Sequence, residues 1–380
     1  MDALAQLALL KPNASLEAES AQEQAVCRPN QESELPITEA MMPNGQRVKL
    51  LKTMVTSACE RNCYYCPFRA GRDLRRATFT PDQLAETYIK LYYTKAVEGL
   101  FLSSGMIGGG ANAQQKIIAT AEILRKRYHY RGYLHGKIMP GAEKGQVHQL
   151  MQYASRVSLN LEAPNAKRLD LLAPHKEFTG ELAQRLIWVE EIRQNHSPHR
   201  TWNGSWPSSA TQFVVGAVGE SDLELISTSE KMLIQAKLRR VYYSRFTPQA
   251  DTPLENHPPE KTRRQHRLYQ SSYLLRDYGF SLEELPFNPD GNLSLETDPK
   301  LAWAQQQIHE QPVEVNQAEK ETLLRIPGIG PVGVTRIIVA RRTRGLNSLY
   351  QLESLGINAK RAAPFILLNG KRPAYQPALI

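Results

Sequence analysis

The stretch Cys59-Glu60-Arg61-Asn62-Cys63-Tyr64-Tyr65-Cys66 holds three of the chain's four cysteines within eight positions. It directly follows the run 48–55, whose apolar residues are typical of a buried β-strand. Thiolates are soft ligands that suit iron–sulfur clusters, zinc or Cu(I), so this crowding indicates metal or redox chemistry. The spacing favours an iron–sulfur cluster, and a zinc site completed by Cys27 or a histidine is the alternative. Cys27 by itself is expected to be an inert thiol, with an auxiliary ligand role as the alternative.

Outward from this motif, apolar runs alternate with helix-like segments through most of the chain. The runs that predict strands are 48–55, 99–102, 132–135, 157–161, 212–216 and 241–244. The segments that predict helices between them are about 80–96, 111–128, 144–154, 180–195 and 221–236. Thr80 and Pro81 open the first of these as N-cap and first helical residue. The alternation predicts an α/β fold with a parallel sheet of six βα units, two fewer than in a full barrel.

Functional side chains are expected just after these strands, because the loops at the carboxyl ends of parallel strands meet at one edge of the sheet. Lys137, after the third strand, is a candidate for a buried charge near such a site. The glycine triplet 108–110 lacks the Lys-Ser/Thr of a phosphate loop and is interpreted as a flexible turn.

The C-terminal end of the chain carries most of its positive charge. The whole chain of 380 residues has a net charge of +9, and residues 316–380 hold ten basic against three acidic residues. Within this segment, Ile326-Pro327-Gly328-Ile329-Gly330-Pro331 predicts a tight turn between two helices. Asn316 and Glu319 predict a capping box for the first helix, and residues 332–342 predict the second. Segments 348–355 and 357–368 look like a degenerate second copy, and a solvated surface or a packing hairpin is the alternative to polyanion binding.

These patterns divide the chain into four parts. We expect an irregular leader at 1–47, the βα domain at 48–257, a helical and loop connector at 258–315 and a small helical domain at 316–380. No apolar run is long enough to span a membrane, and residues 1–10 lack the basic start of a signal peptide. We therefore expect a cytoplasmic protein without a membrane partner.

The CxxxCxYC run after the first of six βα units resembles the signature of the radical S-adenosylmethionine (SAM) superfamily. The resemblance implies a partial (β/α)6 barrel, a [4Fe–4S] cluster held by Cys59, Cys63 and Cys66, and SAM on the fourth iron. It also implies reductive cleavage of SAM to a 5′-deoxyadenosyl radical, with electrons from a partner such as flavodoxin or ferredoxin.

The same resemblance implies a set of SAM contacts at the strand ends. They are Tyr65, Ser103, Ser104, Gly105, Asn160, Glu162, Gly216, Tyr243, Ser244 and Phe246. Ser103-Ser104-Gly105 stands where the superfamily usually has Gly-Gly-Glu, so the usual glutamate is missing here. For Asn160 and Glu162, a capping or ion-pair role is the alternative.

The turn at 326–331 resembles the helix-hairpin-helix motif, which implies sequence-independent binding of DNA phosphates. The residues concerned are Pro327, Gly328, Ile329, Gly330, Arg336, Arg341 and Arg342. The order of a radical SAM core, the segment 268–280, Leu-Pro-Phe, residues 298–304 and this motif resembles the DNA modification and repair group of radical SAM proteins. That resemblance implies DNA as substrate and a uracil-DNA-glycosylase-like protein as a partner. The alternatives are a DNA-binding protein with a structural metal site, and a radical SAM enzyme that modifies RNA.

Overall fold

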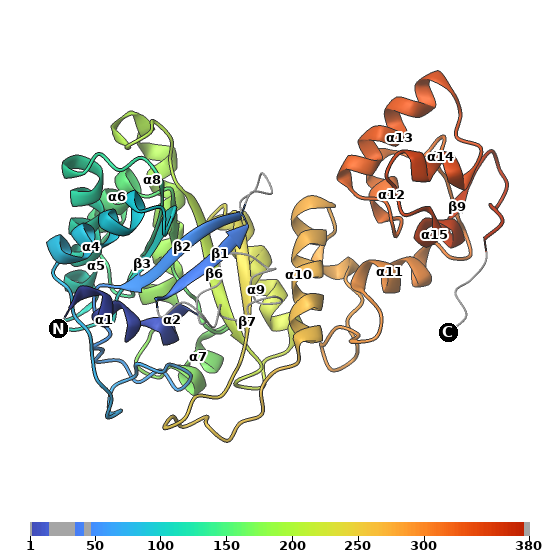
Figure 1. Cartoon of the computed structure of the whole chain (residues 1–380). Coiled ribbons are helices and arrows are strands. Elements are labelled where there is room, and N and C mark those ends of the chain that lie inside the picture. Colours follow the sequence, from blue (N-terminus) through green and yellow to red (C-terminus); the bar gives the residue numbers. More distant parts are fainter. Residues whose placement is uncertain (1, 15–34, 42–46, 376–380) are drawn as a thin grey trace. The chain divides into compact units, whose positions relative to one another are not determined.

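The computed structural model describes residues 2–14, 35–41 and 47–375 (Figure 1). The chain folds into two compact units, which are described separately below. Unit 1 comprises residues 1–220 and 231–265, and unit 2 comprises residues 221–230 and 266–380. The expected boundaries at 257 and 315 are thus replaced by one near 265, because the expected connector packs with the C-terminal helices. Among the described residues, no helix is both long and apolar enough to cross a membrane.

Unit 1 is built on one seven-stranded sheet whose strands follow each other in chain order. Strands β2 to β7 are parallel neighbours, which confirms the predicted six-unit partial barrel. β1 pairs antiparallel with β2 and was not expected, because it lies in the segment predicted to be irregular. The strands are β1 (Ile37–Met41), β2 (Arg47–Met54), β3 (Gly99–Ser103), β4 (Tyr133–Lys137), β5 (Arg156–Ser158), β6 (Ser208–Val215) and β7 (Arg240–Arg245).

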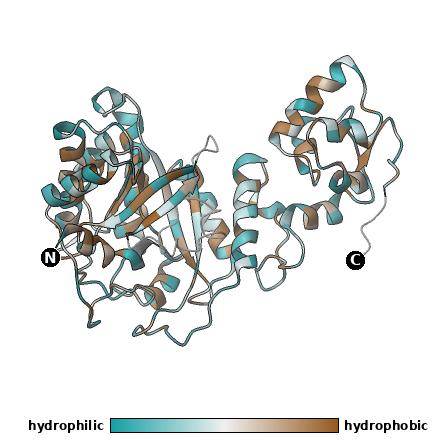
Figure 2. Cartoon of the chain, viewed as in Figure 1, coloured by the Kyte–Doolittle hydropathy of each residue, from teal (hydrophilic) through white to brown (hydrophobic). Residues whose placement is uncertain are grey.

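The parallel strands are buried along most of their length because helices cover the sheet. Every residue of β3 is buried, and in β6 only the first residue is partly exposed. Figure 2 shows this as hydrophobic residues running along the strands. Strands buried on both faces need no alternation of polar and apolar residues, which is why the sequence shows unbroken apolar runs.

The helices of unit 1 lie where the sequence predicts them, with three additions. The predicted ones are α4 (Pro81–Tyr93), α5 (Gly110–Glu122), α6 (Lys144–Tyr153), α8 (Gln184–Asn195) and α9 (Asp222–Gln235), the last of which crosses into unit 2. Thr80 caps α4 as expected, its hydroxyl accepting from the Gln83 amide at 3.2 Å. The additions are the leader helices α1 (Ala3–Ala8) and α2 (Lys11–Ala14), and α7 (Ala166–Leu172). The leader is therefore not irregular throughout.

Helix α7 and two π-helical turns shape the region around the sheet edge. Asn165 caps α7 by accepting from the Arg168 amide at 3.0 Å, a capping signal present in the sequence. The turns η1 (Ile123–Arg127) and η2 (Phe178–Ala183) extend α5 and precede α8. Helices α4, α5, α6 and α8 pack side by side along one face of the sheet (Figure 1).

Unit 2 is mainly helical around a core of its own. Its elements are α10 (Thr262–Asp277), which begins in unit 1, η4 (Leu282–Glu284), α11 (Pro299–Gln307), α12 (Lys320–Arg325), α13 (Pro331–Thr343), α14 (Leu349–Ser354), α15 (Ala359–Ala362) and η5 (Ala363–Phe365). This agrees with the expected small helical domain, and the structure adds one short pair in which β8 (Val313–Glu314) lies parallel to β9 (Ile366–Leu367). The core includes Leu323, Ile326, Ile337 and Ile366, none of which is exposed.

The predicted capping box at Asn316 does not form. Helix α12 begins at Lys320 with Glu319 as its N-cap residue, and this residue makes no side-chain capping bond. The Asn316 side chain instead makes two hydrogen bonds to the backbone of Leu346, donating to its carbonyl at 2.9 Å and accepting from its amide at 2.8 Å. The asparagine therefore ties the start of the domain to the loop after α13, an interaction far along the chain that the local pattern cannot indicate.

Candidate functional site: a cysteine loop and a basic hairpin

The cysteine loop leaves β2 at the carboxyl edge of the sheet and is fixed mainly by backbone bonds. The amide of Glu60 donates to Met106 at 2.7 Å, and that of Tyr64 donates to Leu172, the last residue of α7, at 2.9 Å. The Arg76 guanidinium also fixes the loop, because it donates to the carbonyls of Ser57, Phe68 and Arg69 at 2.7, 2.7 and 2.9 Å. A guanidinium with several carbonyl acceptors holds a loop that has no regular structure of its own.

The three cysteines of this loop differ in how far they are accessible to solvent. Cys63 is buried, and Cys59 and Cys66 are partly exposed. Burial raises the pKa of Cys66 to about 12, and the neighbouring Cys63 contributes to this rise. Burial also raises the pKa of Cys63, against the pull of Lys176. Buried thiols of this kind are poor nucleophiles, and a metal must displace their protons to bind.

A buried ion pair stands beside the thiols. Lys176 Nζ lies 2.8 Å from Glu162 Oε1, and the two side chains are only 9% and 4% exposed. Burial by itself lowers the pKa of Lys176, but attraction by Cys63 and Glu162 raises it overall. The lysine is therefore a charged group held inside the protein by negative neighbours, as a buried charge requires.

Glu162 has two further features that are uncommon away from functional sites. Its backbone lies in the left-handed region at a φ of 67°, where a residue with a side chain is strained. Its second oxygen, Oε2, is buried without a hydrogen-bond partner among the described residues. Tyr65 lies close to the same carboxylate, and burial together with Glu162 raises the pKa of its phenol. A buried acceptor without a hydrogen-bond partner, on a residue with a strained backbone and beside three thiols, indicates a ligand site.

The donor set fits the cluster that the sequence resemblance implies. Three thiols suit three irons of a [4Fe–4S] cube, and Glu162 Oε2 offers an acceptor to a further ligand. Within the described residues, no three His, Cys, Asp or Glu side chains are placed to hold one metal ion. The thiolates of a cube bind separate irons, so they need not converge on one point.

Two other predicted residues meet at the same edge. Lys137, at the end of β4, donates from Nζ to Asn160 Oδ1 after β5, and its side chain is buried as expected. Ser103 and Ser104 are also buried, with the Ser104 hydroxyl donating to the Gly105 carbonyl at 2.7 Å. Gly105 approaches the cysteine loop so closely that a Cβ there would lie 2.2 Å from the Ala58 carbonyl oxygen. The β3 end thus packs on the β2 end through backbone.

The predicted residues after β6 and β7 have mostly packing surroundings. Gly216 has a φ of 88°, and its amide donates to the fully buried Glu220 carboxylate at 2.5 Å. The side chains of Tyr243 and Phe246 are buried in the core, and Ser244 is partly exposed. The glycine triplet at 108–110 has a partner within the protein, because Glu60 accepts from the amides of Gly108 and Gly109 at 3.1 Å. That bond agrees with the prediction of a turn.

In unit 2 the predicted hairpin forms between α12 and α13. Gly328 has a φ of 86°, and a Cβ there would lie 2.4 Å from the Asn358 carbonyl oxygen, so this position requires glycine. The Ile329 amide closes the turn on Ile326 at 3.2 Å. The amides of Gly328 and Gly330 have no backbone acceptor among the described residues, so both remain available to a ligand.

The three predicted arginines of this region differ in their surroundings. Arg341 donates to the carbonyls of Val315 and Ala318 at 3.0 and 2.7 Å, which gives its guanidinium a structural use. Arg336 donates to the Leu355 carbonyl at 2.8 Å from an exposed position. Arg342 is exposed and makes no side-chain hydrogen bond or ion pair with any residue the structure describes. Arg342 is thus the most available of the three to an external anion.

Lys176 is the functional candidate that sequence reasoning missed. It lies in a loop after α7, far from any strand end, and no motif surrounds it. The Tyr64 amide donates to Leu172 and Arg61 pairs with Glu181, and these contacts join the cysteine loop to the segment that carries Lys176. Cys27 lies outside the described residues.

No protein-family model matches the chain, and no curated protein matches it. Solved structures with a similar fold include methylornithine synthase (PylB), with a TM-score of 0.46 and 15% identity over 72% of this chain and 69% of that one. A radical SAM methyltransferase from Sphaerobacter thermophilus matches with a TM-score of 0.44 and 12% identity, over 67% of this chain and 81% of that one. The hydrogenase maturase HydG from Carboxydothermus hydrogenoformans matches with a TM-score of 0.46 and 14% identity. The match covers 60% of this chain and 51% of that one. Because these TM-scores lie below 0.5, the likenesses assign no function, which is inferred below from the chain's own residues.

Proposed function

We propose that the chain is a radical SAM enzyme that acts on DNA. The observation that carries the proposal is the cysteine loop at the carboxyl edge of a six-strand parallel half-barrel, beside the buried carboxylate of Glu162 with its unpaired Oε2. A structural zinc site, the main alternative, gives no reason for an unsatisfied buried acceptor next to the thiols.

The chain's own residues would divide the work at this edge. When bound, a [4Fe–4S] cluster and SAM supply a 5′-deoxyadenosyl radical that abstracts hydrogen from the substrate. Cys59, Cys63 and Cys66 would hold the cluster, and Arg76 keeps their loop in place. Glu162 Oε2 would accept a hydrogen bond from a hydroxyl or amino group of SAM, while Lys176 balances its charge. A protein electron donor such as flavodoxin or ferredoxin would supply the reducing electron.

Unit 2 would hold the DNA. The hairpin offers the amides of Gly328 and Gly330, and Arg342 and Arg336 add positive charge on the adjoining helix α13. Contacts of this kind bind phosphates independently of base sequence, and their affinity falls as the salt concentration rises.

The test is anaerobic purification of the full chain, followed by reduction in the presence of SAM. We expect a brown protein with about four irons per chain, and release of 5′-deoxyadenosine that rises with DNA more than with RNA. Cys63→Ser should lose iron and SAM cleavage, while the matched control Cys27→Ser should retain both. A colourless protein with stoichiometric zinc would contradict the radical SAM assignment, and equal stimulation by RNA would contradict the choice of DNA.

A further inference from the structure

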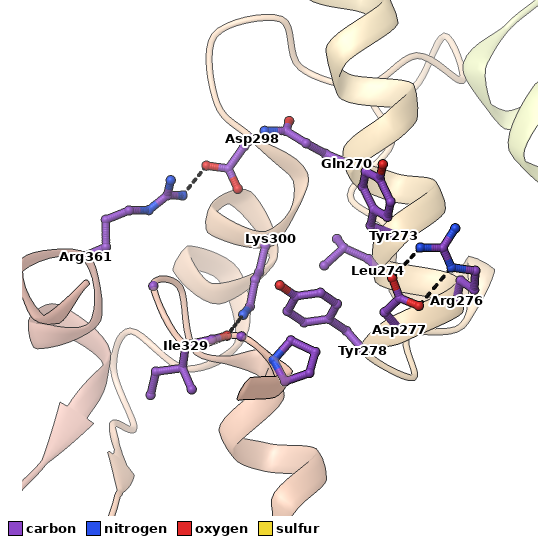
Figure 3. A pocket seen from close by; sticks show the side chains of 13 residues that line it. Gln270, Tyr273, Leu274, Arg276, Asp277, Tyr278, Asp298, Lys300, Ile329 and Arg361 are labelled. Carbon is purple, nitrogen blue, oxygen red and sulfur yellow. Dashed lines mark hydrogen bonds and ion pairs between the residues drawn. The ribbon is translucent and has the colours of Figure 1, made fainter. Parts of the chain in front are cut away.

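Unit 2 contains an open groove of about 800 Å³ next to the hairpin (Figure 3). It lies between the last turns of α10, the start of α11 and the turn 328–331. The volume is in the range of small-molecule and nucleotide sites. The proposed phosphate contacts use the amides of Gly328 and Gly330 at one side of the groove, and they leave its walls on α10 and α11 without a role.

The groove holds one cation that the protein leaves without a carboxylate. Arg276 pairs with Asp277 at 2.6 Å, and Arg361 pairs with Asp298, so these two charges are balanced. Lys300 Nζ donates instead to the Ile329 carbonyl of the hairpin at 2.5 Å, and it forms no ion pair within the described part of the chain. The groove therefore has a net charge of about +1 centred on Lys300, beside the free hairpin amides.

The walls of the groove also carry aromatic rings. Lys300 Nζ lies 4.6 Å from the ring centre of Tyr278, and the Arg276 guanidinium lies 5.0 Å from that of Tyr273. Both rings are partly exposed, and Gln270 stands on the same wall. Aromatic faces beside cations are the usual platform for unstacked nucleic-acid bases.

We propose that this groove binds one unpaired nucleotide of a DNA strand, with its phosphate at Lys300 and its base on Tyr273. The single unbalanced charge suits one phosphate, whereas the paired carboxylates would disfavour a run of phosphates. Gln270, Arg361 and Asp298 offer donors and acceptors of the kind that base edges require. The inference rests on the proposed DNA-binding role of unit 2 and names the form of DNA it selects.

The experiment compares two short DNA duplexes, one fully paired and one with a single bulged 2-aminopurine nucleotide. Binding to the full-length protein is measured by fluorescence anisotropy, and stacking by 2-aminopurine emission. We expect wild type to bind the bulged duplex about tenfold more tightly and to quench its emission, since base stacking on an aromatic ring contributes about 1–3 kcal/mol. Tyr273→Leu and Lys300→Met should lose this preference but keep most binding to the paired duplex.

Matched controls separate the groove from the rest of unit 2. Tyr350→Leu and Lys371→Met change an exposed tyrosine and an exposed lysine that do not line the groove, and both should keep the preference. Tyr273→Phe retains the ring and should keep the wild-type preference for the bulged duplex. If Tyr273→Leu fails to fold, the preference measured for Lys300→Met tests the groove.

The outcomes distinguish the groove from the proposed function. Equal wild-type affinity for both duplexes would overturn the groove inference and leave DNA binding intact. A preference that survives Tyr273→Leu and Lys300→Met would also overturn it. No binding to either duplex would overturn both the groove and the DNA-binding role.

Discussion

Units 1 and 2 each contain a lysine held largely away from water, and the two lysines have opposite surroundings. Lys176 is paired with Glu162 and lies near two thiols, and these negative neighbours raise its pKa despite burial. Lys300 donates to the Ile329 carbonyl and has no ion pair among the described residues. Burial, and then repulsion by Arg361 and Arg325, lowers its pKa to about 7. Asp298 opposes this shift but is itself paired with Arg361.

The difference indicates what each site lacks. In unit 1 the protein provides the counter-charge, so the site holds a neutralised pair and an unsatisfied acceptor that suits a hydrogen-bond donor. In unit 2 the protein leaves a cation short of negative charge, so the groove suits an anion from outside. Buried charge is costly unless compensated, and such a site gains most from the compensating ligand.

The largest expected effect is on stability, from Lys176→Met. Removing one partner leaves the Glu162 carboxylate buried and unpaired, which should cost about 3–5 kcal/mol of the free energy of unfolding. Lys300→Met leaves no carboxylate without its ion-pair partner. It should therefore change that free energy by only about 1 kcal/mol, the contribution of one hydrogen bond. Denaturant titration should be followed by circular dichroism, which reports on both units, and by tryptophan fluorescence, which reports on unit 1 through Trp188, Trp202 and Trp206 and on unit 2 through Trp303.

A double variant is the control for this experiment. Glu162→Gln in the Lys176→Met background removes the uncompensated charge and should recover at least half of the lost stability. Equal losses for Lys176→Met and Lys300→Met would show that the two lysines do not differ in the way described.

A smaller effect is expected on the pH dependence of DNA binding. Lys300 is cationic below its pKa of about 7 and neutral above it, so affinity for the bulged duplex should fall severalfold as pH rises from 6 to about 8. A bound phosphate favours the charged form, so binding near neutral pH should take up a proton. The groups that face Lys300 are Asp298, Arg361, Arg325 and Tyr278.

Lys300→Arg tests that assignment, because a guanidinium stays charged over this range. Its binding should depend less on pH than that of wild type, as measured by anisotropy at constant ionic strength. An unchanged pH profile in Lys300→Arg would assign the titration to another group.

The smallest effect separates two neighbouring arginines of α13. Arg342→Ala removes a cation without a partner among the described residues, so it should lower the slope of log affinity against log salt by about 0.9 and leave stability unchanged. Arg341→Ala breaks two bonds to backbone carbonyls and should reduce stability by about 1–3 kcal/mol with little change in that slope. Equal slopes for both variants would remove Arg342 from the phosphate contacts.

Much of the fold was predictable because its signals are local. Strand β3 is an apolar run buried on both faces, and the capping box of α4 lies within four residues, from Thr80 to Gln83. Helix α7 was missed although Asn165 signals its start, because the helix is short and follows a strand of only three residues. Strand β1 was missed because its place at the edge depends on pairing with β2.

The amino-acid pattern is enough to predict the parallel half-barrel, the cysteine loop after its first parallel strand and the glycine hairpin in the basic tail. These follow from periodicity, spacing and glycine geometry, which act over a few residues. Only the tertiary structure decided the roles of Lys176, Lys300 and Arg341, because their effective charge depends on partners that are distant in sequence or on burial by other elements. The cost of burying a charge is set by what surrounds it, and folding alone brings those neighbours together.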